Sequence, residues 1–319
     1  MRDKVEPKLK AFLEEMDRNN SGSGVLDLTL DDARNNDISF LNDLWSEEII
    51  SENIEINDMY SNLEGLKVPL RMYRSGNTES VLPVIIYFHG GGWVLGNIET
   101  RNASCADLAE KSGACVVSVE YRLAPEHPFP AAVNDCYSAV SWLYKNAEKL
   151  KLDKKNFIVM GDSAGGNLAA VTANKAAEKG YPELYSQVLL YPVINLASID
   201  TPSYHEFAEN HFVTRELMNW FIKQYVPEIN MRSNPEVSPI MEKFRNPPPK
   251  AYVVTAECDV LRDEGEQYAE RLKDNGVETY LQRFNGMIHG FFDMPNISPA
   301  AQEARNSIIN KIKESFIGK

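Results

Sequence analysis

The stretch FIVMGDSAGGNLAA, residues 157–170, joins a predicted buried strand to a predicted helix through one tight turn. The turn has the pattern G-x-S-x-G, in which the residues two before and two after the serine must be small, and Gly161 and Gly165 meet that demand. Such a turn pushes the Ser163 hydroxyl out of the sheet at the N-terminal end of the helix, where the helix dipole favours developing negative charge. The stretch therefore predicts an α/β fold with Ser163 as a nucleophile.

A glycine-rich turn between a strand and a helix can also bind phosphate, but this one lacks the required residues. A dinucleotide-binding fingerprint has glycine at the position of Ser163, and a P-loop ends in Gly-Lys followed by Ser or Thr. Because the sequence fits neither pattern, a nucleophile is the favoured interpretation.

Short apolar strands alternate with helical patterns along the rest of the chain. An alternating pair at 53–60 and 66–74, with a turn at Gly65, comes first. The further predicted strands are 84–88, 115–121, 157–161, 187–192, 251–257 and 277–284, and the predicted helices are 102–112, 130–149, 164–178, 264–275 and 299–316. Strands that are apolar on both faces and separated by helices predict a mostly parallel central sheet with helices on both faces.

Two segments fall outside this alternation, because both show helical patterns and no strand. They predict an N-terminal helical cap segment, 1–50, and a catalytic domain, 51–319, that carries a cap insertion at about 196–230. We expect the cap segment and the insertion to pack together as a lid.

A serine hydroxyl is a weak nucleophile and needs a base. After a turn of this kind the acid and the histidine follow the serine in the chain, which leaves His205, His211 and His289. The first two fall inside the helical insertion. His289 follows the strand 277–284, and loops at the carboxyl ends of parallel strands line the crevice where ligands bind. His289 is therefore the predicted base.

The acidic stretch TAECDVLRDEGEQY, residues 255–268, contains the candidate acid. Asp263 and Glu266 have the spacing of a helix N-cap and its partner three residues on. Glu264 falls in the first turn of that helix, where an acid suits the helix dipole. Asp259 alone stands in the loop between strand and helix, from which it can reach the histidine in the next strand's loop. Asp259 is therefore the predicted acid.

Three glycines follow the strand VIIYF. Without side chains, the backbone N–H groups of Gly90, Gly91 and Gly92 can approach a substrate oxygen closely. Together with the N–H of Ala164, directly after the nucleophile, they predict an oxyanion hole. His89 precedes the serine in the chain and stands where strand meets loop, so we interpret it as a structural hydrogen-bonding residue.

The composition argues against several classes of protein. The formal net charge of −13 disfavours binding to the phosphates of nucleic acids, which requires clusters of Lys and Arg. No apolar run is long enough for a membrane span, and the N-terminus lacks the apolar core of a signal peptide. We therefore expect a cytoplasmic protein. The four cysteines show no CxxC spacing, so buried thiols are expected rather than disulfides or a metal site.

Five motifs together resemble the hormone-sensitive lipase family of α/β-hydrolases, in the order in which that family has them. They are HGGGW (89–93), YRLAPEHPFPAA (121–132), GDSAGGNLA (161–169), DVLRDEGEQYAERL (259–272) and HGF (289–291). The resemblance extends from about residue 60 to the C-terminus.

This resemblance implies an α/β-hydrolase fold with a helical cap, and a serine carboxylesterase that works through an acyl-enzyme without a metal or organic cofactor. Residue by residue, it implies Ser163 as nucleophile, Asp259 as acid, His289 as base, and Gly91, Gly92 and Ala164 as oxyanion donors. Family resemblance and a finite pocket volume favour small ester substrates with acyl chains of roughly C2 to C8. A homodimer through an edge strand at about 277–284 is also expected from the family.

Two alternative functions stay open at this level. Plant hormone receptors that resemble the family lost the histidine and kept the pocket, so the fold also supports a non-catalytic small-molecule binding protein; His289 is present here. The same triad also supports amide hydrolysis or a lipase-like activity on longer esters.

Overall fold

The computed structural model describes residues 2–19, 25–45, 51–76 and 80–317. Its centre is an eight-stranded sheet with the strand order β1-β2-β4-β3-β5-β6-β7-β8. The strands are β1 (Ile54–Leu63), β2 (Leu66–Ser75), β3 (Leu82–Phe88), β4 (Cys115–Val119), β5 (Leu152–Asp162), β6 (Ser186–Leu190), β7 (Lys250–Cys258) and β8 (Thr279–Ile288). Only β2 runs in the opposite direction, because it is antiparallel to both of its neighbours, β1 and β4; all other neighbouring strands are parallel. The predicted mostly parallel sheet is therefore confirmed.

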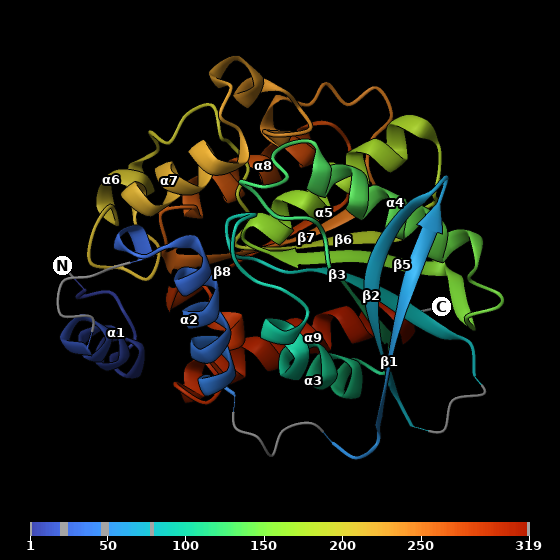
Figure 1. The fold of residues 1–319 in the computed structure, drawn as a ribbon, viewed down its shortest axis with the longest axis horizontal. Helices are drawn as coiled ribbons and strands as arrows, with labels where there is room; N and C mark the ends of the chain where they lie inside the picture. Colours follow the sequence, from blue (N-terminus) through green and yellow to red (C-terminus); the bar gives the residue numbers. More distant parts are fainter. Residues whose placement is uncertain (1, 20–24, 46–50, 77–79, 318–319) are drawn as a thin grey trace.

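Five long helices cover the two faces of the sheet. Figure 1 shows α3 (Asn102–Ser112) and α9 (Pro299–Ile317) below it, and α4 (Ala131–Lys145), α5 (Ala164–Lys179) and α8 (Arg262–Asp274) above it. With both faces covered, every residue of β4 and β6 is buried, which explains why these strands are mostly apolar and show no alternation of buried and exposed residues.

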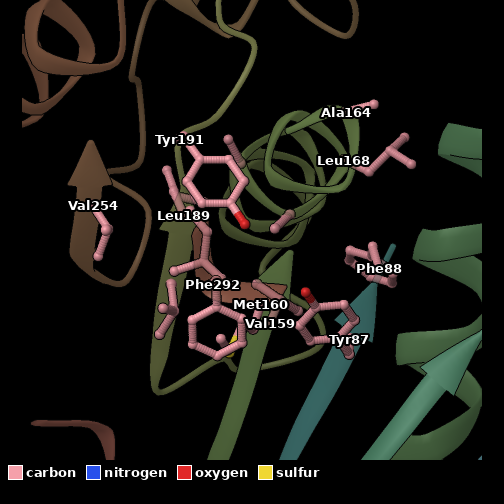
Figure 2. Close-up of a cluster of buried hydrophobic side chains, with 14 of the residues drawn as sticks. Tyr87, Phe88, Val159, Met160, Ala164, Leu168, Leu189, Tyr191, Val254 and Phe292 are labelled. Atoms are coloured by element: carbon pink, nitrogen blue, oxygen red, sulfur yellow. The ribbon is translucent and has the colours of Figure 1, made fainter. Parts of the chain in front are cut away.

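The central strands and the helix after β5 share one apolar core. Figure 2 shows part of it, with Tyr87 and Phe88 from β3, Met160 from β5 and Leu168 from α5 in one cluster. All four side chains are fully buried. This packing fixes the end of β5 against the start of α5, which is where Ser163 lies.

The remaining helices lie together at one side of the sheet (Figure 1). They are α1 (Pro7–Asn19), α2 (Leu30–Asp43), α6 (Pro202–Glu206) and α7 (Arg215–Tyr225), with short 3-10 turns at Val25–Asp27, Glu99–Arg101, Ile229–Ser233, Pro239–Met241 and Phe291–Asp293. The N-terminal segment and the insertion contact each other: the Phe40 and Phe212 rings stack 5.8 Å apart. The predicted boundary between residues 50 and 51 lies outside the described residues.

Local sequence explains where several helices begin and end. Thr214 caps α7, because its side chain accepts a hydrogen bond from the Leu217 N–H at 3.1 Å. Helices α3 and α5 end at Gly113 and Gly180, both in the left-handed conformation that glycine adopts without steric cost.

The start of α8 differs from the sequence-based prediction. The helix begins at Arg262, and its N-cap residue is Leu261, which has no capping side chain. Asp263, predicted as the N-cap, instead accepts a hydrogen bond from the backbone N–H of Ser203 in α6 at 2.7 Å. The capping prediction was wrong because the carboxylate finds a donor on a helix 60 residues away in the chain.

Candidate active site

Ser163 stands on a strained turn between β5 and α5. Its backbone has φ 56° and ψ −117°, a region that costs a non-glycine residue of order 1–3 kcal/mol. A Cβ on Gly165 would overlap the carbonyl oxygen of Phe88, and one on Gly161 would overlap that of Gly165. The two small residues predicted around the serine are therefore required by backbone packing.

The last residue of β6 and the segment after it hold this strained backbone from both sides. The Ser163 N–H donates to the carbonyl of Leu190 at 2.9 Å, and the Val193 N–H donates to the carbonyl of Ser163 at 3.1 Å. These bonds fix the direction of the serine.

His289 and Asp259 come together from the loops after β8 and β7. His289 Nδ1 lies 2.7 Å from Asp259 Oδ2, and the second carboxylate oxygen accepts the Leu261 N–H at 3.0 Å. Both side chains are buried, and the ring of Tyr191 packs against the imidazole with 4.8 Å between ring centroids. The carboxylate is thus placed to hold the proton on Nδ1 and leave Nε2 as an acceptor.

Ser163 and His289 line the same cavity, which has a volume of about 440 Å³. Gly91 and Gly92 line it as well. The apolar part of the wall comes from α2, the 212–221 region and neighbouring loops, and includes Phe40, Leu41, Leu95, Phe212, Val213, Leu217, Met218, Phe221 and Met294. Ser163 and His289 thus lie beside a mostly apolar wall.

The glycine loop after β3 carries two N–H groups that have no partner in the residues that the structure describes. Within the described part of the chain, the N–H groups of Gly91 and Gly92 donate to no protein acceptor, and both residues have positive φ (111° and 61°). A Cβ on Gly92 would overlap the Phe221 ring. Ala164 is the first residue of α5, where N–H groups have no acceptor within the helix.

Gly90 does not fit the predicted oxyanion hole. Its N–H donates to Asp162 Oδ1 at 2.9 Å, and a Cβ at this position would overlap the same carboxylate. The N–H is therefore occupied by the protein, so the inclusion of Gly90 was wrong.

The other histidines lie apart from this arrangement. His89 is fully buried, stacks on Tyr121 at 4.2 Å, and has Nδ1 2.8 Å from the Gly90 carbonyl oxygen. Burial lowers the pKa of His89 to about 4, so it is a neutral structural residue, as expected. His205 pairs with Asp200 and His211 with the carbonyl of Glu209, and neither lines the cavity.

A buried charge network beneath the site was missed by the sequence analysis. Arg101 contacts Asp162 at 2.9 Å and Asp293 at 3.2 Å, and all three side chains line the cavity floor. Burial disfavours the charged form of Asp162, but Arg101 and the Tyr87 hydroxyl outweigh burial and lower its pKa. Burial raises the pKa of Asp293. Arg101 and Asp293 lie outside the catalytic motifs, so no spacing pointed to them.

A further acid reaches the cavity from α2. Asp37 lines the wall, and burial raises its pKa to about 6 against the opposing effect of Arg101. Nothing in the helical pattern of residues 30–43 distinguished this acid from its exposed neighbours Asp31 and Asp32.

The composition also led to expectations about metal sites, cysteines and membrane spans. No group of three or more His, Cys, Asp or Glu side chains in this part of the chain could hold a metal ion. All four cysteines are free and buried. Among the described helices, none is both long and apolar enough to cross a membrane.

Comparisons with known proteins agree with this fold. A family model described as alpha/beta hydrolase fold matches residues 85–293. Carboxylesterase NlhH of Mycobacterium tuberculosis is 37% identical over 274 residues, covering 84% of this chain and 85% of that protein. Ethyl acetate hydrolase of Pseudomonas putida is 32% identical over 323 residues, covering 97% and 99%.

Solved structures of esterases share the whole arrangement. A thermostable esterase from Pseudomonas putida ECU1011 superposes with a TM-score of 0.92, is 36% identical and covers 98% of each chain. A hyperthermophilic esterase from Pyrobaculum calidifontis has a TM-score of 0.90 at 40% identity, covering 97% of this chain and 98% of that one. At these identities the likeness extends beyond the fold to the protein family.

The charge network generates a prediction about stability. Arg101→Met would remove the cation that pairs with Asp162 and would leave Asp293 with only its longer 3.9 Å contact to Arg305, so we expect a loss of about 3–5 kcal/mol in the free energy of unfolding. Urea unfolding at pH 7 measures it. Arg283→Met, which breaks an exposed pair with Glu266, serves as the control and should cost about 1 kcal/mol or less. Equal losses in both variants would contradict the proposed importance of the buried network.

Proposed function

Because this chain belongs to the α/β-hydrolases of the hormone-sensitive lipase and carboxylesterase type, and is itself a carboxylesterase, we propose that Ser163, His289 and Asp259 are its catalytic triad. One observation carries the proposal: the buried 2.7 Å contact between His289 and Asp259 lies at a cavity that the strained Ser163 shares. A buried carboxylate that orients an imidazole beside a serine is the arrangement that serine hydrolases use.

The reaction follows from the positions of these groups. His289 Nε2 takes the Ser163 proton as the hydroxyl oxygen attacks the ester carbonyl. The N–H groups of Gly91, Gly92 and Ala164 stabilise the oxyanion that forms. His289 then returns the proton to the leaving alcohol, and a water molecule repeats the sequence on the acyl-enzyme. Each step uses only groups of the chain, the substrate and water.

We also propose that residues 1–50 and the insertion at about 196–230 act as a cap that sets the size of the substrate. Phe40 from the first segment and Phe212 from the second stack where both line the cavity. A wall of this kind limits the length of the chain that fits, and a volume of about 440 Å³ suits short to medium esters.

The triad is tested by substitution. Ser163→Ala and His289→Gln should abolish turnover of p-nitrophenyl butyrate, and Asp259→Asn should reduce it on the order of 10⁴-fold because the wrong tautomer of the imidazole is then favoured. A fluorophosphonate should label Ser163 in the wild type. His205→Gln and Asp274→Asn, both exposed, are the matched controls and should stay active. A full acyl burst from Ser163→Ala would refute the assignment.

Substrate length is tested with a series of p-nitrophenyl esters. We expect kcat/KM to peak with acyl chains of roughly C2 to C8, because the cavity is finite. Phe212→Ala should move the optimum to longer chains by opening the wall. Tyr181→Ala, at an exposed ring outside the cavity, should leave it unchanged. A higher rate on emulsified long-chain triglyceride would rule out the proposed preference.

We propose that the chain forms a homodimer through β8, the last strand of the sheet. An unpaired strand edge is a template for pairing with a second copy, and Tyr280 on this strand is 48% exposed. Tyr280→Glu should convert a dimer to a monomer in light scattering. Tyr60→Glu, on the opposite edge strand β1 and 66% exposed, should not. A wild type that is monomeric at high concentration would exclude the dimer.

A further inference from the structure

Glu264 on α8 is a buried acid to which the proposed reaction assigns no role. It is only 1% exposed. Its Oε1 accepts two backbone N–H groups, from Ile194 at 2.5 Å and Asn195 at 3.2 Å. One carboxyl oxygen thus fixes the end of a short segment after β6, residues 191–195, which we term the post-β6 segment.

The post-β6 segment is strained and closely packed. Tyr191 has φ 34° and donates its N–H to the Val254 carbonyl at 2.6 Å. Pro192 lies against two glycines: a Cβ on Gly166 would come within 2.9 Å of the proline Cβ, and one on Gly265 within 3.5 Å of its Cδ. Gly166 in α5 and Gly265 in α8 therefore allow Pro192 to pack closely against both helices. This close packing fixes the position of the segment.

The same segment contacts both Ser163 and His289. Val193 donates to the Ser163 carbonyl and the preceding Leu190 accepts the Ser163 N–H. The Tyr191 ring packs against the His289 imidazole. A displacement of the segment would therefore move the nucleophile and the base relative to each other.

We infer that Glu264 is a positioning residue for ester hydrolysis, because it anchors the post-β6 segment that holds the Ser163 backbone and the His289 ring. The inference rests on the proposed roles of Ser163 and His289. Glu264 does not line the cavity, so its effect reaches the reaction through the segment and not through contact with substrate.

The charge state of Glu264 identifies the conservative substitution. Burial raises its pKa to about 8, and the nearby Asp259 charge acts in the same direction. Within the described residues, Oε2 is buried and has no hydrogen-bond partner. Burial thus favours the neutral acid, whose carbonyl oxygen can accept both N–H groups. Glutamine has the same length and the same acceptor.

Three substitutions test the inference in the full chain. Glu264→Gln should keep kcat for p-nitrophenyl butyrate within about threefold of wild type. Glu264→Met, which removes the acceptor, and Glu264→Asp, which shortens its reach, should each lower kcat by about 10²-fold, because small misplacements of reacting groups are costly. KM should stay within about threefold, since no substrate contact is lost. The matched control is Glu270→Met, on the exposed side of the same helix.

The results separate the inference from the triad proposal. Loss of all activity in Ser163→Ala, with full activity in Glu264→Met, would overturn the role of Glu264 and leave the triad intact. Equal losses in Glu264→Gln and Glu264→Met would also overturn it, because the acceptor would then not be what matters. If Glu264→Met fails to fold, the comparison of Glu264→Asp with Glu264→Gln decides: equal kcat values refute the inference, and a large deficit in the aspartate variant alone supports it.

Discussion

The strained backbone of Ser163 is the constraint on which the rest of the site depends. A residue with φ 56° and ψ −117° stays in that conformation only if its surroundings leave no alternative. Two glycines let the turn approach the Phe88 carbonyl, and the bonds to Leu190 and Val193 hold it from the other side. In this conformation Ser163 lines the cavity. The contacts that stabilise the strained backbone come from β3, β5 and β6.

Asp162, directly before Ser163, links this turn to the glycine loop. Its Oδ1 accepts the Gly90 N–H and the Tyr87 hydroxyl, and its Oδ2 binds Arg101. A buried carboxylate is stable only when paired and hydrogen-bonded, and here each partner belongs to an element that the site needs in place. The Gly90 N–H is used in this bond, whereas the N–H groups of Gly91 and Gly92 have no protein acceptor among the described residues.

The loop that carries Asp259 is joined to the insertion by polar contacts. Ser203 in α6 donates its hydroxyl to the Val260 carbonyl at 2.7 Å and its N–H to Asp263. Arg262 lies over the Phe207 ring and contacts Glu206. Because these residues flank Asp259, the acid loop and the insertion form one packed unit. The acidic stretch at the start of α8 thus also binds the insertion through hydrogen bonds and an ion pair.

The sequence by itself determined the parallel sheet, the helix positions and the residues Ser163, Asp259 and His289 as site candidates. Each of these predictions depends on a local pattern. The periodicity of apolar residues predicts the strands and helices, the glycines on either side of Ser163 predict the nucleophile, and Asp259 and His289 each follow a predicted strand. Only the tertiary structure decided which glycine N–H groups stay free, what Asp263 and Glu264 bind, and that Arg101, Asp293 and Asp37 reach the cavity. Those facts depend on partners far away in the chain, and the hydrogen bond or ion pair that joins such residues leaves no pattern in either stretch of sequence.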